Sequence, residues 1–393
     1  MNYLEKLLQG APVEWKTLGE VAKLQRGRVI SKQYLSENMG DYPVYSSQTA
    51  NNGEIGTIST FDFDQEAITW TTDGANAGTV FHRFGKFSIT NVCGLVNILD
   101  LQKLDYKFLF YWLSIEAKKY VYSGMGNPKL MSNQMEKIKI PIPPLSVQKE
   151  IARILDAFTA ITSELTSELT LRQKQYQHYR DKLLTFGDEV EWKTIEEIFN
   201  LKNGYTPSKS KKEYWENGTI PWFRMEDIRE NGRVLDSSLQ KVSEAGVKGG
   251  KLFKANSFII ATSATIGEHA LIKVPFLANQ RFTNLELKDA FKAKFSTKFI
   301  FYYCFLLDEW CKKNTTKSSF SSVDMASFKK FKFPIPPIEE QKRIATILDK
   351  FHTLTSSLSE GLPKEIELRQ KQYEYYRDLL LNFKQDEASL SPS

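Results

Sequence analysis

The chain has 393 residues, of which 41% are hydrophobic and 25% are charged. This composition excludes a disordered or collagen-like chain, and at roughly 100–200 residues per domain the length predicts two domains or three. The net charge of +6 permits an acidic partner such as nucleic acid without requiring one.

Cysteine and histidine usage gives no sign of a metal or disulfide scaffold. The three cysteines form no CxxC pair, and the four histidines are scattered. A reducing compartment suits such a chain best. The longest apolar run, Phe299–Leu307, is too short to span a bilayer, and the N-terminus, with its acidic Glu5, has no apolar core of signal-peptide length. We therefore expect a cytoplasmic protein without a membrane span.

An internal repeat organises the sequence. The segment Val13–Thr17 recurs as Val190–Thr194, and Leu171–Tyr176 recurs as Leu368–Tyr373. The chain is therefore two copies of one unit, each with a variable lobe followed by a closely matched stretch. The segments in chain order are an N-terminal piece of the helical repeat (1–10), a first lobe (11–140), a first long helix (141–186), a second lobe (187–333), a second long helix broken near 361–363 (334–383) and a flexible tail (384–393).

The lobes and the matched stretches differ in character. The lobes are rich in Gly, Asn, Ser and Thr with short β-branched runs, which predicts mixed α+β domains with many loops. In the matched stretches apolar residues recur at gaps of three or four, which predicts long helices. Each helix is entered through a Pro-Pro pair, at 143–144 and 336–337, and Gly361–Pro363 should interrupt the second.

The long apolar stripes need a partner, and the other copy is the obvious one. This predicts an antiparallel, coiled-coil-like pair, with two solvated helices on separate lobes as the alternative. The residues expected to pair the helices or to dock a partner protein are Phe158, Ile161, Leu165, Leu169, Tyr176, Tyr179, Leu183, Phe351, Leu354, Leu358, Tyr373, Tyr376 and Leu380.

The chain begins where a repeat helix ends. Tyr3–Leu8 matches Tyr179–Leu184, and the chain finishes with the same element at Leu379–Phe383. Such a permuted start predicts that the termini lie close together. We expect a quasi-circular α+β molecule with pseudo-twofold symmetry, in which the paired helices separate two globular lobes.

Catalytic motifs are nearly missing. We find no GxxxxGK[ST] phosphate loop, no GxSxG elbow and no HExxH motif. Asn127–Lys129 fails the Asn-Pro-Pro-aromatic pattern of amino-methyltransferases at its third position. Glu14–Lys16 and Glu191–Lys193 resemble half of a nuclease signature without a convincing upstream acid, so we interpret their tryptophans as structural anchors.

The polar and basic loops are better candidates for function. Lys and Arg neutralise phosphates, and Arg, Asn and Gln pair with base edges; the alternative is a solvated surface. The candidates in the first lobe are Arg26, Arg28, Lys32, Gln48, Asn51, Asn52, Thr72, Asn76 and Lys129. The candidates in the second lobe are Tyr205, Thr206, Lys209, Lys211, Lys212, Arg224, Ser263, Thr265, Gln280, Arg281 and Lys317.

Taken together, these features resemble the specificity (S) subunit of type I restriction–modification systems over essentially the whole chain. The resemblance is carried by the Pro-Ile-Pro-Pro entries, by Gln-Lys-x-Ile-Ala-x-Ile-Leu-Asp at 148–156 and 341–349, and by Arg-Gln-Lys-Gln-Tyr. The tandem Thr-Ser-Glu-Leu at 162–169 resembles the type IC branch. The first lobe departs from the pattern, with Thr72–Asn76 where the second has Ser263–Gly267.

The resemblance implies that each lobe reads one half of a split, asymmetric site in double-stranded DNA. It also implies that the helices set the spacing and dock two methyltransferase subunits, which restriction–translocase subunits then join. The chain itself would hold no active site, metal or cofactor, and S-adenosylmethionine, Mg and ATP would belong to partner subunits. The alternatives are a coiled-coil scaffold that does not bind DNA and a stand-alone DNA-modifying enzyme.

Overall fold

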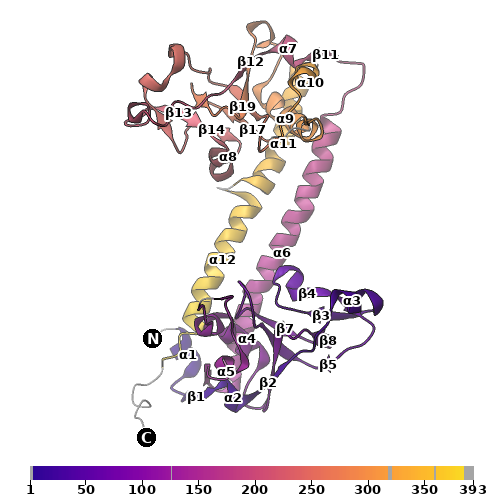
Figure 1. Cartoon of the computed structure of the whole chain (residues 1–393), viewed down its shortest axis with the longest axis vertical. Helices are drawn as coiled ribbons and strands as arrows, with labels where there is room; N and C mark the ends of the chain where they lie inside the picture. Colours follow the sequence, from indigo (N-terminus) through magenta and orange to yellow (C-terminus); the bar gives the residue numbers. More distant parts are fainter. Residues whose placement is uncertain (1–2, 125, 317–320, 358–359, 385–393) are drawn as a thin grey trace. The chain divides into compact units, whose positions relative to one another are not determined.

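The computed structural model describes residues 3–124, 126–316, 321–357 and 360–384. The chain forms two compact units, one made of Met1–Ser163 with Arg369–Ser393 and the other of Glu164–Leu368. Each unit holds one lobe together with parts of the long helices, and Figure 1 labels the elements. Among the described ranges, no helix is both long and apolar enough to cross a lipid bilayer.

The first lobe is built on two four-stranded sheets. One has the order β2-β9-β6-β7 and is antiparallel throughout, and the other has the order β4-β3-β8-β5 with β3 and β8 parallel. The strands are β2 (Ala22–Arg26), β3 (Tyr42–Tyr45), β4 (Glu54–Ile58), β5 (Phe63–Asp64), β6 (Ala67–Thr71), β7 (Val80–Arg83), β8 (Lys86–Ile89) and β9 (Cys93–Ile98). The helices are α2 (Leu18–Val21), α3 (Lys32–Glu37), α4 (Tyr106–Glu116) and α5 (Ser132–Met135), with 3₁₀ turns at Ala50–Gly53 and Ala117–Tyr120.

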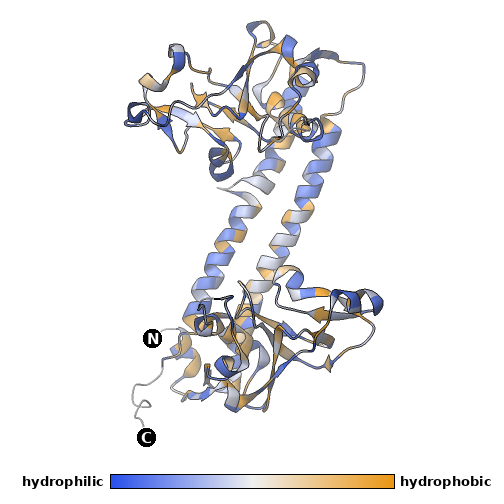
Figure 2. Cartoon of the chain, viewed as in Figure 1, coloured by the Kyte–Doolittle hydropathy of each residue, from blue (hydrophilic) through white to orange (hydrophobic). Residues whose placement is uncertain are grey.

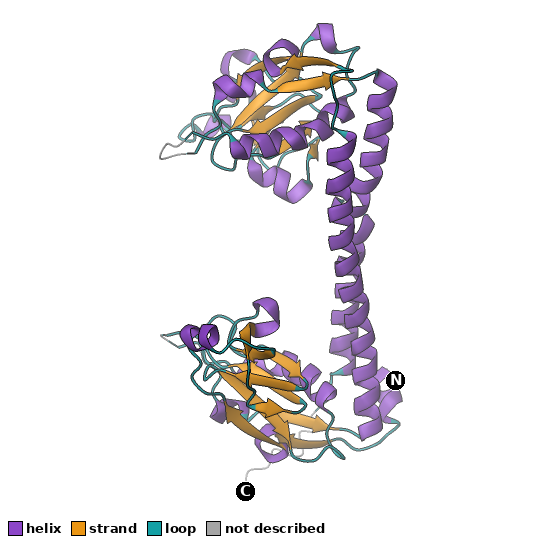
Figure 3. Ribbon diagram, turned by 90° about the vertical axis from the view of Figure 1, so that its right-hand side faces the viewer, coloured by secondary structure: helices purple, strands orange, loops and turns teal. Residues whose placement is uncertain are grey.

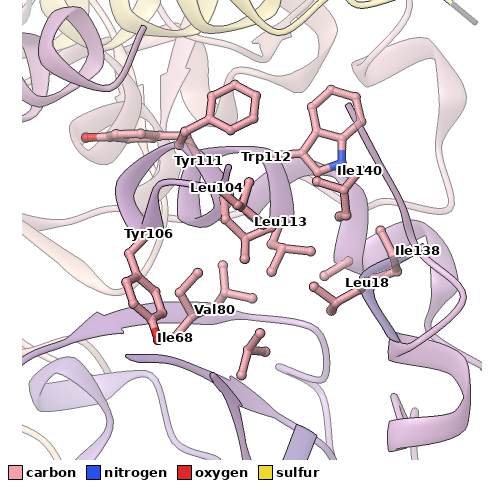
Figure 4. Packing of buried hydrophobic residues seen from close by; sticks show 14 of the residues in the cluster. Leu18, Ile68, Val80, Leu104, Tyr106, Tyr111, Trp112, Leu113, Ile138 and Ile140 are labelled. Atoms are coloured by element: carbon pink, nitrogen blue, oxygen red, sulfur yellow. The ribbon is translucent and has the colours of Figure 1, made fainter. Parts of the chain in front are cut away.

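The core of the first lobe lies between α4 and the β2-β9-β6-β7 sheet. The α4 helix begins at an Asp105 cap, whose carboxylate accepts a hydrogen bond from the Phe108 amide at 2.9 Å. Its buried face packs on the strands, as Figure 4 shows for Tyr106, Leu113 and Val80. Each fully buried side chain of this size stabilises the fold by about 1.5–3 kcal/mol.

The second lobe repeats this plan with different details. Its five-stranded sheet has the order β12-β19-β16-β17-β14, and a three-stranded sheet has the order β15-β13-β18 with β13 and β18 parallel. Short helices accompany the sheets in each lobe (Figure 3). The strands are β12 (Phe199–Asn203), β13 (Ile220–Phe223), β14 (Val234–Leu235), β15 (Lys241–Val242), β16 (Ser257–Ala261), β17 (His269–Ile272), β18 (Leu277–Ala278) and β19 (Phe282–Leu287). The helices are α7 (Ile195–Ile198), α8 (Met225–Asn231), α9 (Thr297–Lys313) and α10 (Met325–Lys330), with 3₁₀ turns at Lys212–Tyr214, Glu244–Gly246, Lys248–Gly250 and Asp289–Phe291.

A two-stranded ribbon closes each lobe at its junction with a long helix. In the first lobe β1 (Glu14–Thr17) pairs antiparallel with β10 (Lys139–Ile142), and in the second β11 (Glu191–Thr194) pairs in the same way with β20 (Lys332–Ile335). Trp15 and Trp192 are partly buried against the cores of their own lobes, as expected for structural anchors.

The long helices pair within each unit through aromatic side chains. These helices are α6 (Leu145–Leu183), α11 (Ile338–Ser356) and α12 (Gly361–Leu380), and hydrophilic and hydrophobic residues are mixed along them (Figure 2). In the first unit the ring of Phe158 stacks on that of Tyr376, with centroids 5.2 Å apart. In the second unit Tyr179 stacks on Phe351 at 5.7 Å. The prediction of an α+β fold with two β-rich lobes and long helices is confirmed.

Other residues expected at the helix pair vary in their burial. Tyr176 and Leu380 are buried, whereas Ile161, Tyr179 and Leu354 keep 36–40% of their surface exposed. The remaining described members are partly buried, namely Phe158, Leu165, Leu169, Leu183, Phe351, Tyr373 and Tyr376, while Leu358 lies outside the described residues.

The interruption of the second long helix lies slightly earlier than the sequence predicts. Helix α11 ends at Ser356 and α12 begins at Gly361, so Pro363 lies in the first turn of α12. Proline is tolerated there because its missing N–H has no partner within the helix.

The first and last described segments of the chain both contribute to the core of the first unit. Leu4 of α1 (Tyr3–Leu8) is buried in the same cluster as Leu380, the last residue of α12, and Leu381, which follows it. The described N-terminal and C-terminal segments therefore pack together in this unit.

Candidate nucleic-acid interface

The second lobe has a polar pocket that gathers most of the residues predicted there. Its volume is about 290 Å³. The predicted residues in its lining are Thr206, Lys209, Arg224, Ser263, Thr265, Gln280 and Arg281. The remaining lining residues, which were not among the predicted site residues, are Trp222, Met225, Glu226, Asn279 and Phe282. Four separate stretches of the lobe thus converge on one concave site.

Close packing of two loops builds one wall of this pocket. A Cβ atom at Gly204 would lie 2.2 Å from the carbonyl oxygen of Asn279, so only glycine fits. The amide of Tyr205 donates to the carbonyl of Ala278 at 2.8 Å. One residue further on, the hydroxyl of Thr206 donates to the side-chain oxygen of Gln280. The loop after β12 is therefore tied to the turn after β18 by backbone and side-chain bonds.

The opposite wall is the loop from Ser263 to Gly267. Ala264 has a φ of +64°, a left-handed conformation that costs an L-residue roughly 1–2 kcal/mol. A Cβ at Gly267 would lie 2.6 Å from the carbonyl oxygen of Asp308, so this end also needs glycine. The strained backbone presents Ser263 and Thr265 to the pocket, and such strain tends to cluster at functional sites.

The pocket carries positive charge that acidic neighbours offset only partly. The guanidinium of Arg224 lies 5.7 Å from the ring centroid of Trp222 and 3.9 Å from the carboxylate of Glu226. Its buried Nε atom has no hydrogen-bond partner among the described residues. Lys209 and Arg281 are exposed, and no described carboxylate lies within ion-pair distance of either. Such a surface can attract a polyanion and pair with polar groups.

The other predicted residues of this lobe lie outside the pocket. Tyr205 packs its ring in the cluster of Trp222, and its hydroxyl accepts a hydrogen bond from the Lys248 amide at 2.7 Å. Lys211 donates to the hydroxyl of Tyr214 at 3.1 Å, and this bond raises the pKa of the lysine. Lys212 lines a neighbouring pocket of about 380 Å³ together with Lys209. Lys317 lies outside the described residues.

In the first lobe part of the predicted set gathers around Asp73. Arg26 donates through Nε to the backbone oxygen of Asn91 at 3.1 Å, and its Nη2 lies 3.9 Å from Asp73. The ammonium of Lys129 lies 4.0 Å from the same carboxylate. Thr72 is fully buried, because its backbone joins the neighbouring loops, so Asp73 occupies the accessible position instead. Asn76 is exposed in the same loop.

The remaining candidates of the first lobe are placed elsewhere on its surface. The Nε of Arg28 donates a bifurcated hydrogen bond to the two carboxylate oxygens of Asp62, at 3.1 and 3.0 Å. Lys32 is exposed at the start of α3. Gln48, Asn51 and Asn52 form one loop, in which both asparagines have a left-handed backbone and Gln48 donates to the Glu54 carbonyl.

A buried arginine that the sequence did not reveal supports that loop. Arg83 lies 3.6 Å from the ring centroid of Tyr45 and donates to the backbone oxygen of Asn52 at 2.8 Å. Burial lowers its pKa, because desolvation penalises the charged form. An arginine inside a β-strand gives no sequence signal of burial, so only the structure identifies it.

No metal-binding constellation is evident in the part of the chain that the structure describes, since no three His, Cys, Asp or Glu side chains gather suitably. The chemistry that the described pocket offers is hydrogen bonding and charge: hydroxyls, amides, guanidinium groups and an ammonium group.

Comparisons with known proteins identify the family of this chain. The profile described as "Type I restriction modification DNA specificity domain" matches twice, over residues 12–172 and 187–368. The chain is 39% identical to the EcoR124I/EcoR124II specificity subunit of Escherichia coli, over 99% of this chain and 98% of that protein. It is 61% identical to the EcoprrI specificity subunit of the same species, over 53% of this chain and 54% of the relative.

Solved structures show the same fold. The match to the S subunit of a type I restriction–modification system from M. genitalium covers 98% of this chain and 100% of that subunit, with a TM-score of 0.61 at 17% identity. A second structure, from work on complex assembly of the type I R-M system, covers 94% of this chain with a TM-score of 0.58 at 15% identity. On the two profile matches and the full-length relative, the chain belongs to the family of type I restriction–modification specificity subunits.

Proposed function

We propose that each lobe of this DNA-specificity subunit reads one half of a split, asymmetric site in double-stranded DNA. The observation that carries the proposal is the pocket of the second lobe, where loops far apart in the sequence bring amide, hydroxyl and guanidinium groups to one concave surface. Those are the groups that pair with base edges, while nearby lysines neutralise phosphates. The first lobe presents Arg26, Asp73 and Lys129 in the corresponding role.

The helices have a second role in this proposal. They hold the two lobes at the separation of the half-sites and dock two methyltransferase subunits, which restriction–translocase subunits join. Apolar side chains that remain exposed on the helices support a docking role, since Leu171, Leu368 and Tyr375 keep 49–65% of their surface accessible. S-adenosylmethionine, Mg and ATP would be bound by the partners, and the complex would act in the cytoplasm.

A direct test measures DNA binding by this chain in complex with its methyltransferase subunit. Replacing Arg281 with Ala should relax discrimination at one base pair by about 1–3 kcal/mol. Replacing Lys209 with Ala should weaken binding to all sequences and lower the salt slope by up to about 0.9. Lys292, which pairs with Asp289 and does not line the pocket, is the matched control.

The alternatives make different predictions in the same experiment. A coiled-coil scaffold would leave the complex unable to select any duplex from a random pool. A stand-alone modifying enzyme would modify DNA without the methyltransferase subunit. Either result would contradict the proposal, and selection of a split site only by the complex would support it.

A further inference from the structure

Five backbone hydrogen bonds place the turn Thr90–Cys93 of the first lobe in register with Asn279–Phe282 of the second. In both turns the fourth residue donates to the first, with Cys93 to Thr90 at 2.9 Å and Phe282 to Asn279 at 3.0 Å. In both, the amide of the first residue donates to the last carbonyl of the strand that runs parallel to the strand before the turn. Thr90 donates to Tyr45 at 2.9 Å, and Asn279 donates to Phe223 at 3.0 Å.

Of the other three bonds, two connect each turn to neighbouring loops and the third joins two of those loops to each other. In the first lobe they run from Thr72 to Val92 at 3.2 Å, from Gly27 to Cys93 at 3.3 Å and from Leu130 to Thr72 at 2.9 Å. In the second lobe they run from Thr262 to Arg281 at 3.0 Å, from Gly204 to Phe282 at 2.9 Å and from Val323 to Thr262 at 2.8 Å. The glycines also match, because a Cβ at Gly27 would lie 2.1 Å from the carbonyl oxygen of Ile89.

This register pairs the two central positions of the turns. Asn91 corresponds to Gln280, and Val92 corresponds to Arg281. Both amide residues are exposed. The side chain of Asn91 makes no hydrogen bond to another described residue, while its backbone oxygen is held by Arg26. Arg26 therefore holds the turn through its backbone, and the side-chain amide of Asn91 is left available for a ligand.

We propose that Asn91 is a specificity-determining residue of the first lobe and reads an adenine edge in the major groove of the first half-site. The inference rests on the proposed function, in which Gln280 lies in the reading pocket of the second lobe. An asparagine amide offers one donor and one acceptor in the geometry of adenine N7 and N6.

The neighbour of each amide distinguishes the two lobes. The side-chain oxygen of Gln280 already accepts a hydrogen bond from Thr206, so its amide presents donors to the groove. Val29 lies two residues after Gly27, as Thr206 lies two residues after Gly204, and 75% of the surface of Val29 is exposed. Valine cannot donate to Asn91, so both ends of that amide remain free to pair. Asn91 is thereby suited to an edge with a donor and an acceptor, whereas Gln280 is suited to an acceptor edge.

The test selects sites from a random duplex pool with the complex of this chain and its methyltransferase subunit. Gln280→Ala identifies the half-site of the second lobe by the position at which it relaxes selection. Asn91→Ala should then lose roughly 10- to 100-fold of its discrimination at one A·T position in the other half-site and leave the remaining positions unchanged. Asn91→Asp, which keeps the shape and loses the donors, should relax the same position.

The matched control is Gln102→Ala, an exposed amide of the same lobe outside this turn. Unchanged discrimination in both Asn91 variants would overturn the inference while leaving the proposed function intact. Relaxation of a G·C position, or of a position in the Gln280 half-site, would overturn it as well. A wild-type complex that selects no split site would overturn the proposed function and the inference together.

Discussion

Gln148 and Gln341 are fully buried glutamines that make the same three hydrogen bonds at the start of α6 and of α11. The side-chain nitrogen of Gln148 donates to the carbonyls of Pro143 and Lys103, both at 2.8 Å, and its oxygen accepts from the Asp105 amide at 2.9 Å. Gln341 makes the equivalent bonds to Pro336, Lys294 and Ser296, all at 2.8 Å. Each glutamine thus ties a long helix to its own lobe.

Replacing either glutamine should destabilise its unit. Gln341→Leu keeps the bulk but removes the partner of three backbone groups, one buried and two partly buried, at a cost of about 1–3 kcal/mol for each group that water cannot reach. Denaturant titration of the free energy of unfolding measures the loss. Gln102→Ala, an exposed glutamine of the first lobe, should change stability by less than about 0.5 kcal/mol. Equal stability of the Gln341→Leu and wild-type chains would refute the role of Gln341 in tying α11 to its lobe.

A second contact that recurs in both units makes the free energy of unfolding depend on pH in the alkaline range. The hydroxyl of Tyr302 donates a hydrogen bond to Asp349 at 2.6 Å, and that of Tyr111 donates one to Asp156 at 2.7 Å. Burial, reinforced by the neighbouring carboxylate, raises the pKa of both tyrosines above the usual value. The folded state therefore holds these protons more tightly than the unfolded state does.

The free energy of unfolding should consequently stay level up to about pH 10, the ordinary tyrosine pKa, and fall as the pH rises further. The Tyr302→Phe variant should be less stable than the wild type at pH 8 and should show a shallower fall between pH 9 and pH 11. Parallel curves for the two proteins would exclude Tyr302 as a source of the dependence. Asp349→Asn provides a control that keeps the tyrosine and removes the charge.

The close approach at Gly204 predicts a local defect from a small change. In Gly204→Ala the new methyl group would meet the backbone of Ala278 and Asn279, so the turn that carries Gln280 must shift. We expect a stability loss of about 1–3 kcal/mol and weaker recognition of the second half-site. Gly126→Ala is the control, because a Cβ there meets nothing within 4 Å. Undisturbed recognition in Gly204→Ala would show that the turn tolerates displacement.

The sequence predicted the repeated plan and much of the second pocket, because both depend on local patterns. Helical periodicity, proline entries and turn-forming glycines are visible in the sequence itself. It aligned Thr72 with Ser263, however, whereas the strand register pairs Thr72 with Thr262 and leaves Asp73 at the partly accessible position. A shift of one residue exchanges a buried side chain for one that faces the other way.

Sequence reasoning does not single out Asn91, because its proposed role depends on distant partners. Asn91 stands in a segment without a motif, and only the register with Gln280 singles it out. The sequence predicts Tyr205 as a DNA-binding residue, and in the structure its ring packs beside Trp222. Such assignments depend on long-range strand pairing, which local composition does not encode.

The tandem Thr-Ser-Glu-Leu in α6 predicts how the spacing of the half-sites can be changed. A third copy after Leu169 would lengthen the helix by roughly 6 Å and rotate its end by a net 40° or so. B-DNA advances about 3.4 Å and about 34–36° per base pair, so the rotation matches one added pair. We expect both half-sites to be kept and the gap between them to widen by one base pair. Mapping the methylated sites of the insertion variant measures the gap, and an unaltered gap would exclude α6 as the element that sets the spacing of the half-sites.

The claim that each lobe reads its own half-site is tested most directly by exchanging one lobe. Residues 11–140 would be replaced by the first lobe of another family member, and the DNA sites methylated by the resulting complex would be mapped by single-molecule sequencing. We predict that one half-site changes to that of the donor, while the other half-site and the gap remain as in the parent. A change in both half-sites would contradict independent reading by the two lobes.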